Sequence, residues 1–498
     1  MFMFTSFASD KIPLISMKVD IASRHNRSFF GLNIQFVKDG ALHLRTLAVR
    51  ELFSSHTSEN LKIVVNEILS NYNIFNDRIY TFTSDNGRNM VKLGELLQET
   101  QVEEDSVDEA VNNEVNFSAT TLVRCCVHTL QLAVLDAIND PSVNRIIAKA
   151  RHAVKALRNE STLQTLKKKY NVNKPTLDVV TRWSSTCSML ASLLSAKEFC
   201  KDFEAEKPAL SLADEEWCHI EDCLKALSPC KKATLRLQTQ NLVPGDVYGI
   251  WYTCKLETER IDTLFAKKLK SSMIKREKHL MENEALLASM FLDPRYLPLL
   301  KETTMKIAKE TLLIVWDAIK KTNEEETQVP PTEDSLMELD EDVDLLSLEI
   351  QRRDAERQFR LSNGGVSQIE SLLDEFAKTP KIPLKEDILK YWEVRKSSSP
   401  ELYSLATIVH AAPMTQVSVE RLFSGMKFII SDLRTNLSHD MIDDILIVRT
   451  NKNFQKDCIA EEKPAKKKKI IHIENMSSDN LSTGSSSTEL IDDELITN

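Results

Sequence analysis

Residues 15–87 limit the possible folds more than any other part of the chain. Apolar and polar side chains alternate over 15–21 and again over 30–36, and this period of two predicts β-strands. The alternation puts Asp20 on the face opposite the apolar side chains of its strand. A third strand is predicted over 41–52, so the chain begins with a small sheet.

The segments between these strands add turns, a bulge and a helix. Lys38-Asp39-Gly40 predicts a hairpin turn, and the alternation slips near Thr46, which indicates a bulge. Ser58 is the expected cap of an amphipathic helix, and a strand over 79–83 then ends at Ser84-Asp85-Asn86-Gly87. The order of these elements is that of an RNase H-like fold: three strands, a helix and then a strand that ends in an acid. This is an analogy of topology, and a shared fold does not establish a shared chemistry.

Residues 401–451 form the second informative stretch and predict two amphipathic helices. Apolar side chains recur at helical spacing from Val419 to Ile430, after an N-cap expected at Thr415. Ser438 is the expected cap of the second helix. Glu420 lies at the edge of the first apolar stripe, where the ordinary interpretation is a solvated helix position.

Composition excludes several classes of protein. A length of 498 residues allows two or three domains, and the net charge of −10 means that any contact with DNA must come from local basic patches. The nine cysteines have no zinc-finger spacing, so no zinc site is readable and free thiols in a reducing compartment are expected. We expect no membrane span, because no sufficiently long apolar run is present. No small-molecule substrate is expected either.

The block SVERLFSGMKFIISDLRTNLS, within 401–451, resembles the C-terminal dimerisation region of hAT-superfamily DNA transposases and of the BED-finger proteins derived from them. The resemblance implies a homodimer or a higher homo-oligomer and makes Glu420 the last acid of a DDE-type catalytic set. The residues that the resemblance makes candidates for dimerisation are Leu422, Phe423, Met426, Ile442, Ile445 and Leu446.

Two further blocks resemble those around the other acids of this set. VDIASRHNRSFFGLNIQFV, residues 19–37, implies Asp20 as the first acid, although Ala22 stands where the family commonly has Trp. TSDNGRNMVK, residues 83–92, implies Asp85 as the second. Three carboxylates suit Mg²⁺ or Mn²⁺, which would support DNA strand cleavage or transfer. The alternative is that the aspartates are ordinary strand-end and turn residues.

Two blocks imply contacts with DNA. TLVRCCVHTLQLAVLDAI, residues 121–138, resembles the family block whose histidine lies near the active site, here His128, and the alternative is a core or capping histidine. LDVVTRWSSTCSMLASLL, residues 177–194, implies that Trp183 stacks on an extruded base and that Arg182 pairs with a phosphate. The alternative for Trp183 is a core anchor.

Charged segments provide the remaining candidates. The helical stretch 144–170 and the segment 267–278 are basic, and each is either a phosphate-binding surface or a solvated helix face. Residues 323–350 are acidic and predict a disordered loop. A basic cluster near the end of the chain predicts a nuclear localisation signal and therefore a nuclear protein; its residues are Lys463, Lys466, Lys467, Lys468 and Lys469.

These observations predict an α/β fold with an all-α insertion, in which an RNase H-like mixed sheet is split by a large helical domain and completed by a C-terminal helical dimerisation region. The expected parts are 12–127 for the first part of the core, 128–385 for the helical insertion, 386–455 for the dimerisation region and 456–498 for the basic signal and tail. The chain starts too close to Asp20 to include a BED finger, so autonomous transposition is not expected. Two functions stay open: a metal-dependent DNA transposase or nuclease, and a catalytically inactive regulator of transcription or chromatin derived from one.

Overall fold

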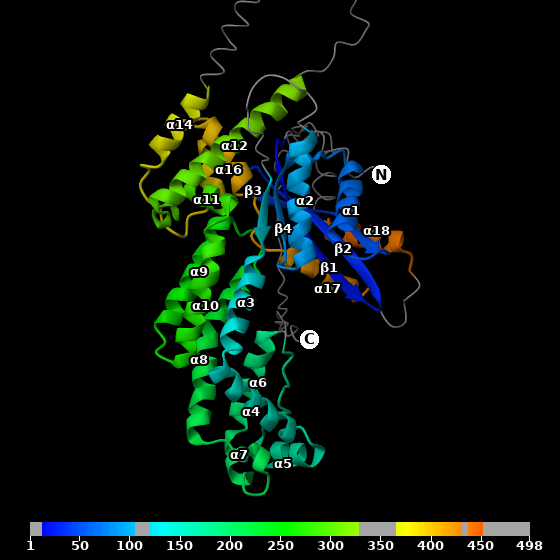
Figure 1. Ribbon diagram of the computed structural model, residues 1–498, viewed down its shortest axis with the longest axis vertical. Helices are drawn as coiled ribbons and strands as arrows, with labels where there is room; N and C mark the ends of the chain where they lie inside the picture. Colours follow the sequence, from blue (N-terminus) through cyan, green and yellow to red (C-terminus); the bar gives the residue numbers. More distant parts are fainter. Residues whose placement is uncertain (1–11, 105–119, 181, 328–364, 431–436, 452–498) are drawn as a thin grey trace, which may run out of the picture. The chain divides into compact units, whose positions relative to one another are not determined.

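The computed structural model describes residues 12–104, 120–180, 182–327, 365–430 and 437–451 (Figure 1). These residues form a mixed α/β structure that is mostly helical and contains one five-stranded sheet. The predicted nuclear localisation signal lies outside the described residues. Among the helices that are described, none combines the length and the apolar character needed to span a membrane.

The sheet has the strand order β3-β2-β1-β4-β5. Its strands are β1 (Ile15–Arg24), β2 (Arg27–Lys38), β3 (Ala41–Leu52), β4 (Ile79–Ser84) and β5 (Thr121–Arg124). β1, β2 and β3 pair in antiparallel fashion, whereas β4 runs parallel to both β1 and β5. The mixed sheet expected from the sequence is therefore present, and the central strand β1 lies between an antiparallel and a parallel neighbour.

The predicted turn and bulge are both present. Asp39 and Gly40 adopt φ angles of 50° and 67°, the left-handed conformation that a tight hairpin turn requires. The register between β2 and β3 shifts so that Leu32 pairs with Ala48 while Asn33 pairs with Thr46. The extra residue in β3 is the bulge that the slipped alternation near Thr46 indicated.

One face of the sheet is apolar and is covered by α1 (Ser58–Ser70) and α2 (Arg88–Glu104). The odd-numbered side chains of β1, such as Met17 and Val19, are buried in this layer. The side chain of Thr57 caps α1 by accepting a hydrogen bond from the backbone N–H of Asn60. The expected cap at Ser58 was therefore one residue too late, since Ser58 is already the first helical residue.

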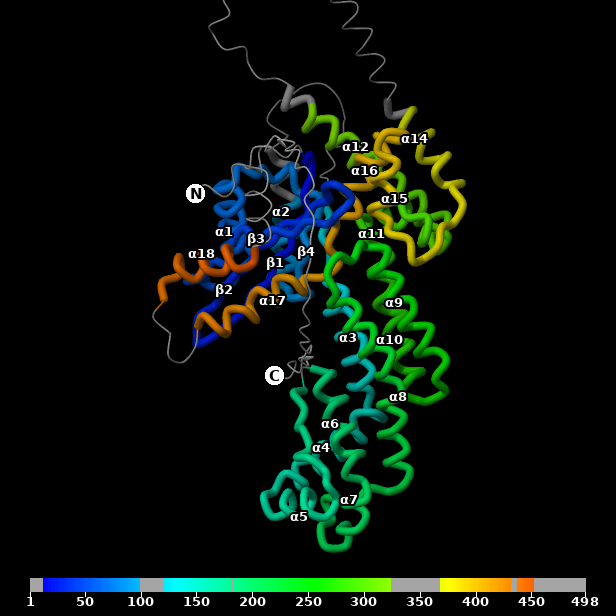
Figure 2. The backbone as a smooth tube through the Cα atoms, turned by 180° about the vertical axis from the view of Figure 1, so that it is seen from behind, coloured from blue at the N-terminus to red at the C-terminus, as the bar shows by residue number. Residues whose placement is uncertain are grey.

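The opposite face is covered by the C-terminal part of the chain, as the tube in Figure 2 shows for α17 (Val417–Met426) and α18 (His439–Thr450). Both helices bury apolar side chains against Phe29 of β2 and Val49 of β3. Gln416, rather than the predicted Thr415, precedes the first turn of α17, whereas Ser438 caps α18 as predicted. Segments far apart in the sequence thus form one layered structure.

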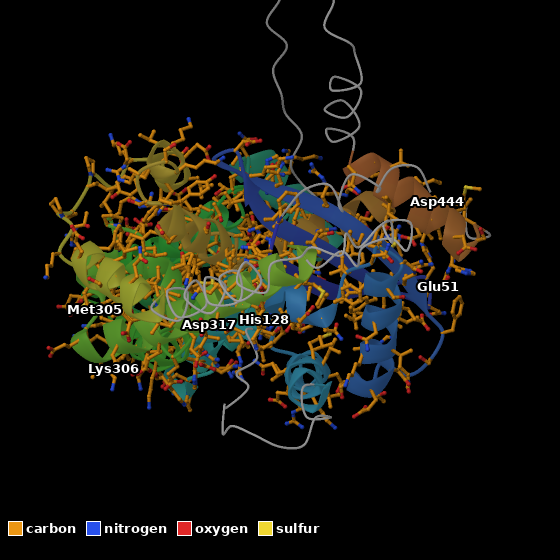
Figure 3. The ribbon with its side chains drawn as sticks, turned by 90° about the horizontal axis from the view of Figure 1, so that it is seen from above. Glu51, His128, Met305, Lys306, Asp317 and Asp444 are labelled. Atoms are coloured by element: carbon orange, nitrogen blue, oxygen red, sulfur yellow. The ribbon has the colours of Figure 1, made fainter. Side chains whose placement is uncertain are left out.

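α18 also covers the outer edge of β3. The carboxylate of Asp443 accepts a hydrogen bond from the backbone N–H of Val49 at 2.6 Å. Thr46 and Asn451 exchange two hydrogen bonds, one from the Thr46 N–H at 3.1 Å and one to the Thr46 carbonyl at 2.9 Å. Side chains of α18 and its C-cap therefore form hydrogen bonds with backbone groups of β3 that another strand would otherwise pair with. Figure 3 labels Glu51 of β3 and Asp444 of α18 on the same side of the molecule.

The helical part follows β5 directly. Its helices up to the acidic segment are α3 (Cys126–Ile138), α4 (Pro141–Leu157), α5 (Glu160–Tyr170), α6 (Trp183–Ser195), α7 (Lys197–Phe203), α8 (Asp214–Leu237), α9 (Pro244–Glu259), α10 (Leu264–Leu280), α11 (Glu284–Phe291) and α12 (Glu302–Thr327). The helices after it are α14 (Gly365–Phe376), α15 (Ile388–Arg395) and α16 (Pro400–Val409). α12 continues through Thr327, so the predicted loop 323–350 is helical at its start, and its remainder lies outside the described residues.

A buried charged cluster fixes the junction after α11. Arg295 donates to both carboxylate oxygens of Asp293 and to the carbonyl of Glu386, and its guanidinium lies 3.1 Å from Asp246. The ring of Tyr296 lies so close to α9 that a Cβ atom at Gly249 would be 2.6 Å from its hydroxyl oxygen. Together these contacts hold the turn after α11 in place.

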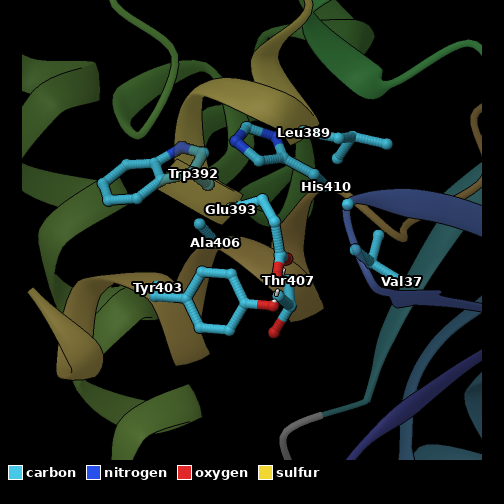
Figure 4. A pocket seen from close by; sticks show the side chains of 9 residues that line it. Val37, Leu389, Trp392, Glu393, Tyr403, Ala406, Thr407 and His410 are labelled. Atoms are coloured by element: carbon cyan, nitrogen blue, oxygen red, sulfur yellow. Dashed lines mark hydrogen bonds between the residues drawn. The ribbon is translucent and has the colours of Figure 1, made fainter. Parts of the chain in front are cut away.

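Side chains fill the narrow space between α15, α16 and the β2–β3 turn (Figure 4). The Tyr403 hydroxyl donates to Glu393 at 2.7 Å, and Nδ1 of His410 shares a hydrogen bond with Ser289 of α11 at 2.8 Å. Burial lowers the pKa of His410 to about 3, so its ring is neutral at physiological pH. The space has no room for a water molecule, and it is therefore a packing contact rather than a ligand site.

Candidate active site

Asp20 lies on β1 and points away from the apolar layer, as its place in the alternation predicted. Its neighbours Val19 and Ile21 pack with the layer that holds α1 and α2, whereas Asp20 is half-buried beneath the opposite layer. One carboxylate oxygen accepts a hydrogen bond from the backbone N–H of Ile21 at 2.9 Å. The central strand therefore holds this carboxylate rigidly.

Asp85 directly follows β4, which lies beside β1 in the sheet. Its Oδ1 atom accepts a hydrogen bond from the backbone N–H of Gly87 at 2.9 Å and so forms a tight turn before α2. The carboxyl ends of parallel strands meet at one edge of a sheet, and this brings Asp85 to the region of Asp20. Asp85 therefore both forms the turn and lies in the region of a second acid.

Glu420 lies in the first turn of α17, which packs against both β1 and β2. Val419, the residue before it, is fully buried against the sheet, so the helix is anchored next to the acid. Glu420 itself is at the exposed rim of the group. The prediction that this acid comes from a helix completing the sheet region agrees with its position.

The three carboxylates influence one another electrostatically. Burial, and then the charges of Glu420 and Asp85, raise the pKa of Asp20 to about 7, against the opposing hydrogen bond from Ile21. Glu420 is exposed at its outer side, but desolvation by the surrounding protein and the charge of Asp85 also raise the pKa of its carboxyl group. None of the three forms an ion pair with a cation among the described residues. The site therefore concentrates negative charge that the described part of the chain does not neutralise.

This arrangement suits a divalent cation in charge and in donor type, because Mg²⁺ and Mn²⁺ prefer carboxylate oxygens. The spacing is wider than that of a closed metal site: within the described ranges, no three His, Cys, Asp or Glu side chains are close enough to share one ion. The same observation leaves α8, which carries Cys218, His219, Cys223 and Cys230, without a zinc site among its described residues.

The layer beneath the acids contains a residue that the sequence interpretation missed. Lys18 is buried on the same face of β1 as Asp20, and its amine donates to Gln35 Oε1 at 2.8 Å. Gln35 in turn donates to the carbonyl of Ala411, in the link between α16 and α17. Burial, assisted by the charge of Arg421, lowers the pKa of Lys18 to about 7. The sequence did contain a signal for Lys18: it lies two residues before Asp20, so both side chains are on the same face of the strand.

His128 lies in the first turn of α3, near the loop that carries Asp85. The side-chain amide of Asn86 donates to the hydroxyl of the adjacent Thr129 at 3.5 Å, which links that loop to α3. Among the described residues, the imidazole of His128 has no hydrogen bond or ion pair with any of the three acids. The structure therefore puts His128 close to the site in the fold without a direct contact.

Arg182 and Trp183 belong to the helical part instead. Arg182 is exposed just before α6, but the indole of Trp183 is only 4% exposed and packs in the helical core with α4 and α8. The structure thus supports the core-anchor interpretation of Trp183 rather than base stacking. The same block contains a pair that was missed: Asp178 accepts two hydrogen bonds from Arg151, at 2.8 and 2.7 Å.

Ion pairs neutralise part of each basic segment, and in the first segment Lys149 and Arg151 of α4 pair with Glu216 and Asp178. On α10, Lys267, Lys268 and Arg276 each lie within ion-pair distance of an aspartate, so the interpretation as a solvated face is favoured. On α5, Lys168 and Lys169 are exposed and have no partner within the described part of the chain. The last turn of α5 is therefore the better candidate for a phosphate contact.

The predicted dimerisation residues pack almost entirely within the chain. Five of them are buried against the sheet: Leu422, Phe423, Met426, Ile442 and Leu446. Of the predicted set only Ile445 is exposed, on the outer side of α18. The dimerisation role of these five residues stays a prediction; in the structure the apolar stripe on each helix faces the strands of its own sheet. The outer side of α18 instead exposes Met441, Ile445 and Val448.

Comparison with known proteins agrees with this architecture. Residues 372–451 match the hAT family C-terminal dimerisation region, and residues 123–226 match the ZBED1 RNase-like helical domain. In these two regions the chain is therefore similar to hAT-type transposase-derived proteins.

Its relatives carry the names of BED-finger proteins and of a transposase. Over 87% of its length, the chain is 23% identical to the zinc finger BED domain-containing protein RICESLEEPER 3 of Oryza sativa subsp. japonica. It is 24% identical to the "Putative AC transposase" of Zea mays over 86% of its length, and 23% identical to the human zinc finger BED domain-containing protein 4 over 63%. The chain covers only 60%, 55% and 28% of these three proteins.

Proposed function

We propose that this chain is a hAT-transposase-like, DNA-associated protein with an RNase H-like core, in which Asp20, Asp85 and Glu420 hold Mg²⁺ or Mn²⁺ for cleavage or transfer of DNA strands. The observation that carries the proposal is the electrostatic proximity of three carboxylates from β1, the end of β4 and α17, because the charges of Glu420 and Asp85 raise the pKa of Asp20. The strand order β3-β2-β1-β4-β5 supports the RNase H-like assignment.

Each acid has a distinct part in this proposal. Asp20 is fixed by the central strand and by the N–H of Ile21, and Asp85 is fixed by its turn. Glu420 depends on the seating of α17 against the sheet. These carboxylates would hold divalent ions, which would help to activate a water or 3′-hydroxyl and to stabilise the leaving oxygen. His128, Arg182 and the cations of α5 are the candidates for contacts with the DNA.

The test is a nicking assay on hairpin and pre-nicked DNA with Mg²⁺ or Mn²⁺. We expect wild type to cut and Asp85→Asn to lose activity, since the amide cannot replace a charged ligand. Asp317→Asn is the matched control, because Asp317 is an exposed aspartate on α12. Equal product from wild type and Asp85→Asn would contradict the enzymatic proposal.

A second function is favoured by one specific observation, the absence of a closed three-ligand group among the described residues. In this case the chain is a catalytically inactive regulator of transcription or chromatin that keeps the fold of a transposase. DNA binding in a shift assay without metal-dependent nicking by any variant would support this function. Nuclear localisation is proposed in both cases, and it is tested by the distribution of a fluorescent fusion after replacement of Lys466, Lys467, Lys468 and Lys469 by alanine.

We also propose that two copies associate through the outer side of α18, within the region matched to the dimerisation family. Met441, Ile445 and Val448 are exposed there, and Phe428 is 76% exposed beside Arg449. Ile445→Asp should abolish association in light scattering while the chain stays folded. Phe423→Asp should unfold the chain instead, because Phe423 is buried against β2. Unchanged association of folded Ile445→Asp would exclude this surface.

A further inference from the structure

Gly31 of β2 lies directly opposite Asp20 in the pairing of β1 with β2, beneath α17. A Cβ atom at this position would lie 2.8 Å from Val419 Cγ1, 3.0 Å from Phe423 Cζ and 3.4 Å from a methyl group of Leu422. Carbon atoms normally pack at about 3.5–4.0 Å. Even the smallest side chain at Gly31 would therefore push against the helix that carries Glu420.

Backbone conformation does not explain a glycine here. Gly31 pairs regularly with Asp20 on one side and with Val49 on the other, and its φ angle is outside the left-handed region. Glycine inside a strand is unfavourable, because it gives up packing and costs conformational entropy. What the residue provides at this point is space for the close approach of α17.

We infer that Gly31 is a positioning residue for the acid site: its missing side chain lets α17 lie against β2 and thereby sets Glu420 beside Asp20. Val419 and Glu420 are consecutive in the first helical turn, so a shift of Val419 also moves Glu420. Within the described ranges, no hydrogen bond to the Glu420 carboxylate holds it in place independently. The inference rests on the proposed role of the acids and adds the residue that fixes their separation.

The expected displacement is small but sufficient to matter. Relief of a 2.8 Å contact to ordinary packing distance requires a movement of roughly 1 Å, either of α17 or of the strand. Residues that orient metal ligands typically change metal affinity by roughly 10–100-fold when they are replaced. Gly31→Ala should therefore weaken the binding of Mn²⁺ by about this factor in a protein that is still folded.

The experiment compares wild type, Gly31→Ala, Val419→Ala and the double variant Gly31→Ala/Val419→Ala in the full chain. Mn²⁺ affinity is measured by calorimetry or by electron paramagnetic resonance, and folding is measured by circular dichroism. We expect Gly31→Ala to weaken Mn²⁺ binding and the double variant to recover most of it, since removal of the Val419 methyl groups makes room for the new one. If Gly31→Ala does not fold, Val419→Ile tests the same contact from the helix side and should also weaken binding.

A second measurement needs no metal and separates this inference from the proposed function. Asp20→Asn and Glu420→Gln are combined in a double-mutant cycle of unfolding free energy at pH 8, in wild type and in the Gly31→Ala background. The coupling between the two acids should be present in wild type and be reduced when Gly31 is alanine. If wild type binds no Mn²⁺ but Gly31→Ala still reduces the coupling, only the proposed metal site is contradicted. If wild type binds Mn²⁺ and Gly31→Ala binds it equally well, or if the coupling is the same with glycine and alanine at position 31, the inference is overturned.

Discussion

The pH dependence of stability offers a direct test of the acid site through Asp20→Asn. In the folded protein the pKa of Asp20 is raised from 3.8 to about 7, mainly by burial and then by the charges of Glu420 and Asp85. Between these two values the folded chain holds a proton that the unfolded chain has already released. The free energy of unfolding therefore decreases as the pH rises from about 4 to 7, and the full cost of the charged carboxylate is present above pH 7.

The size of this effect follows from the same numbers. One pKa unit corresponds to about 1.4 kcal/mol, so the rise in pKa sets an upper value of about 4 kcal/mol. Asp20 is only half-buried, and solvent screening reduces the expected effect to roughly 2–3 kcal/mol. Asn cannot ionise, and Asp20→Asn should therefore stabilise the protein by this amount at pH 8 and have little effect at pH 4.

The assay is urea unfolding of wild type and Asp20→Asn at several pH values. Lys18 acts in the opposite sense, because its pKa is lowered to about 7 and stability rises with pH above that value. This contribution is common to both proteins and cancels in their difference. Asp317→Asn, at an exposed position on α12, should give a difference near zero at every pH. Parallel stability curves for wild type and Asp20→Asn would refute the electrostatic description of the site.

Substitutions at Trp183, Gly249 and Asp443, with Arg182→Ala as a control, test contacts elsewhere in the chain. Trp183→Ala should destabilise the chain by about 3–5 kcal/mol in denaturant unfolding, because the indole is buried in the helical core. Arg182→Ala, at the exposed neighbouring position, should change the unfolding free energy by less than about 0.5 kcal/mol. Gly249→Ala should lower the unfolding free energy by about 1–3 kcal/mol through the clash with Tyr296, and a variant as stable as wild type would show that the ring moves freely. Asp443→Ala should cost about 1–3 kcal/mol, because it leaves the N–H of Val49 without its acceptor, and faster amide exchange at Val49 would report the same loss.

Local sequence patterns were sufficient to predict four of the five strands of the sheet. The alternation around Asp20 determined which face of β1 the acid occupies, and the slip near Thr46 located the bulge. These features depend on neighbouring residues and on the geometry of single strands, which the sequence displays directly. The end of β4 at Asp85 was predictable for the same reason.

Features that depend on what covers a surface were not predictable. An apolar stripe shows that one side of a helix is buried, but it does not show which strands cover it, here Phe29 of β2 and Val49 of β3 against Phe423. Trp183 could be assigned to the core only once the neighbouring helices were in place. Lys18 and Gly31 are inconspicuous in the sequence, because their importance comes from α17, which is remote in the chain and close in space.

The coverage of β3 by α18 has a consequence for assembly. An open strand edge recruits other strands, which leads to aggregation or to sheets that continue from one subunit into the next. Here Asp443 and Asn451 bind the backbone of β3 at Val49 and Thr46, so these positions of the edge are closed to such pairing. Loss of α18 should open them and promote aggregation through β-pairing.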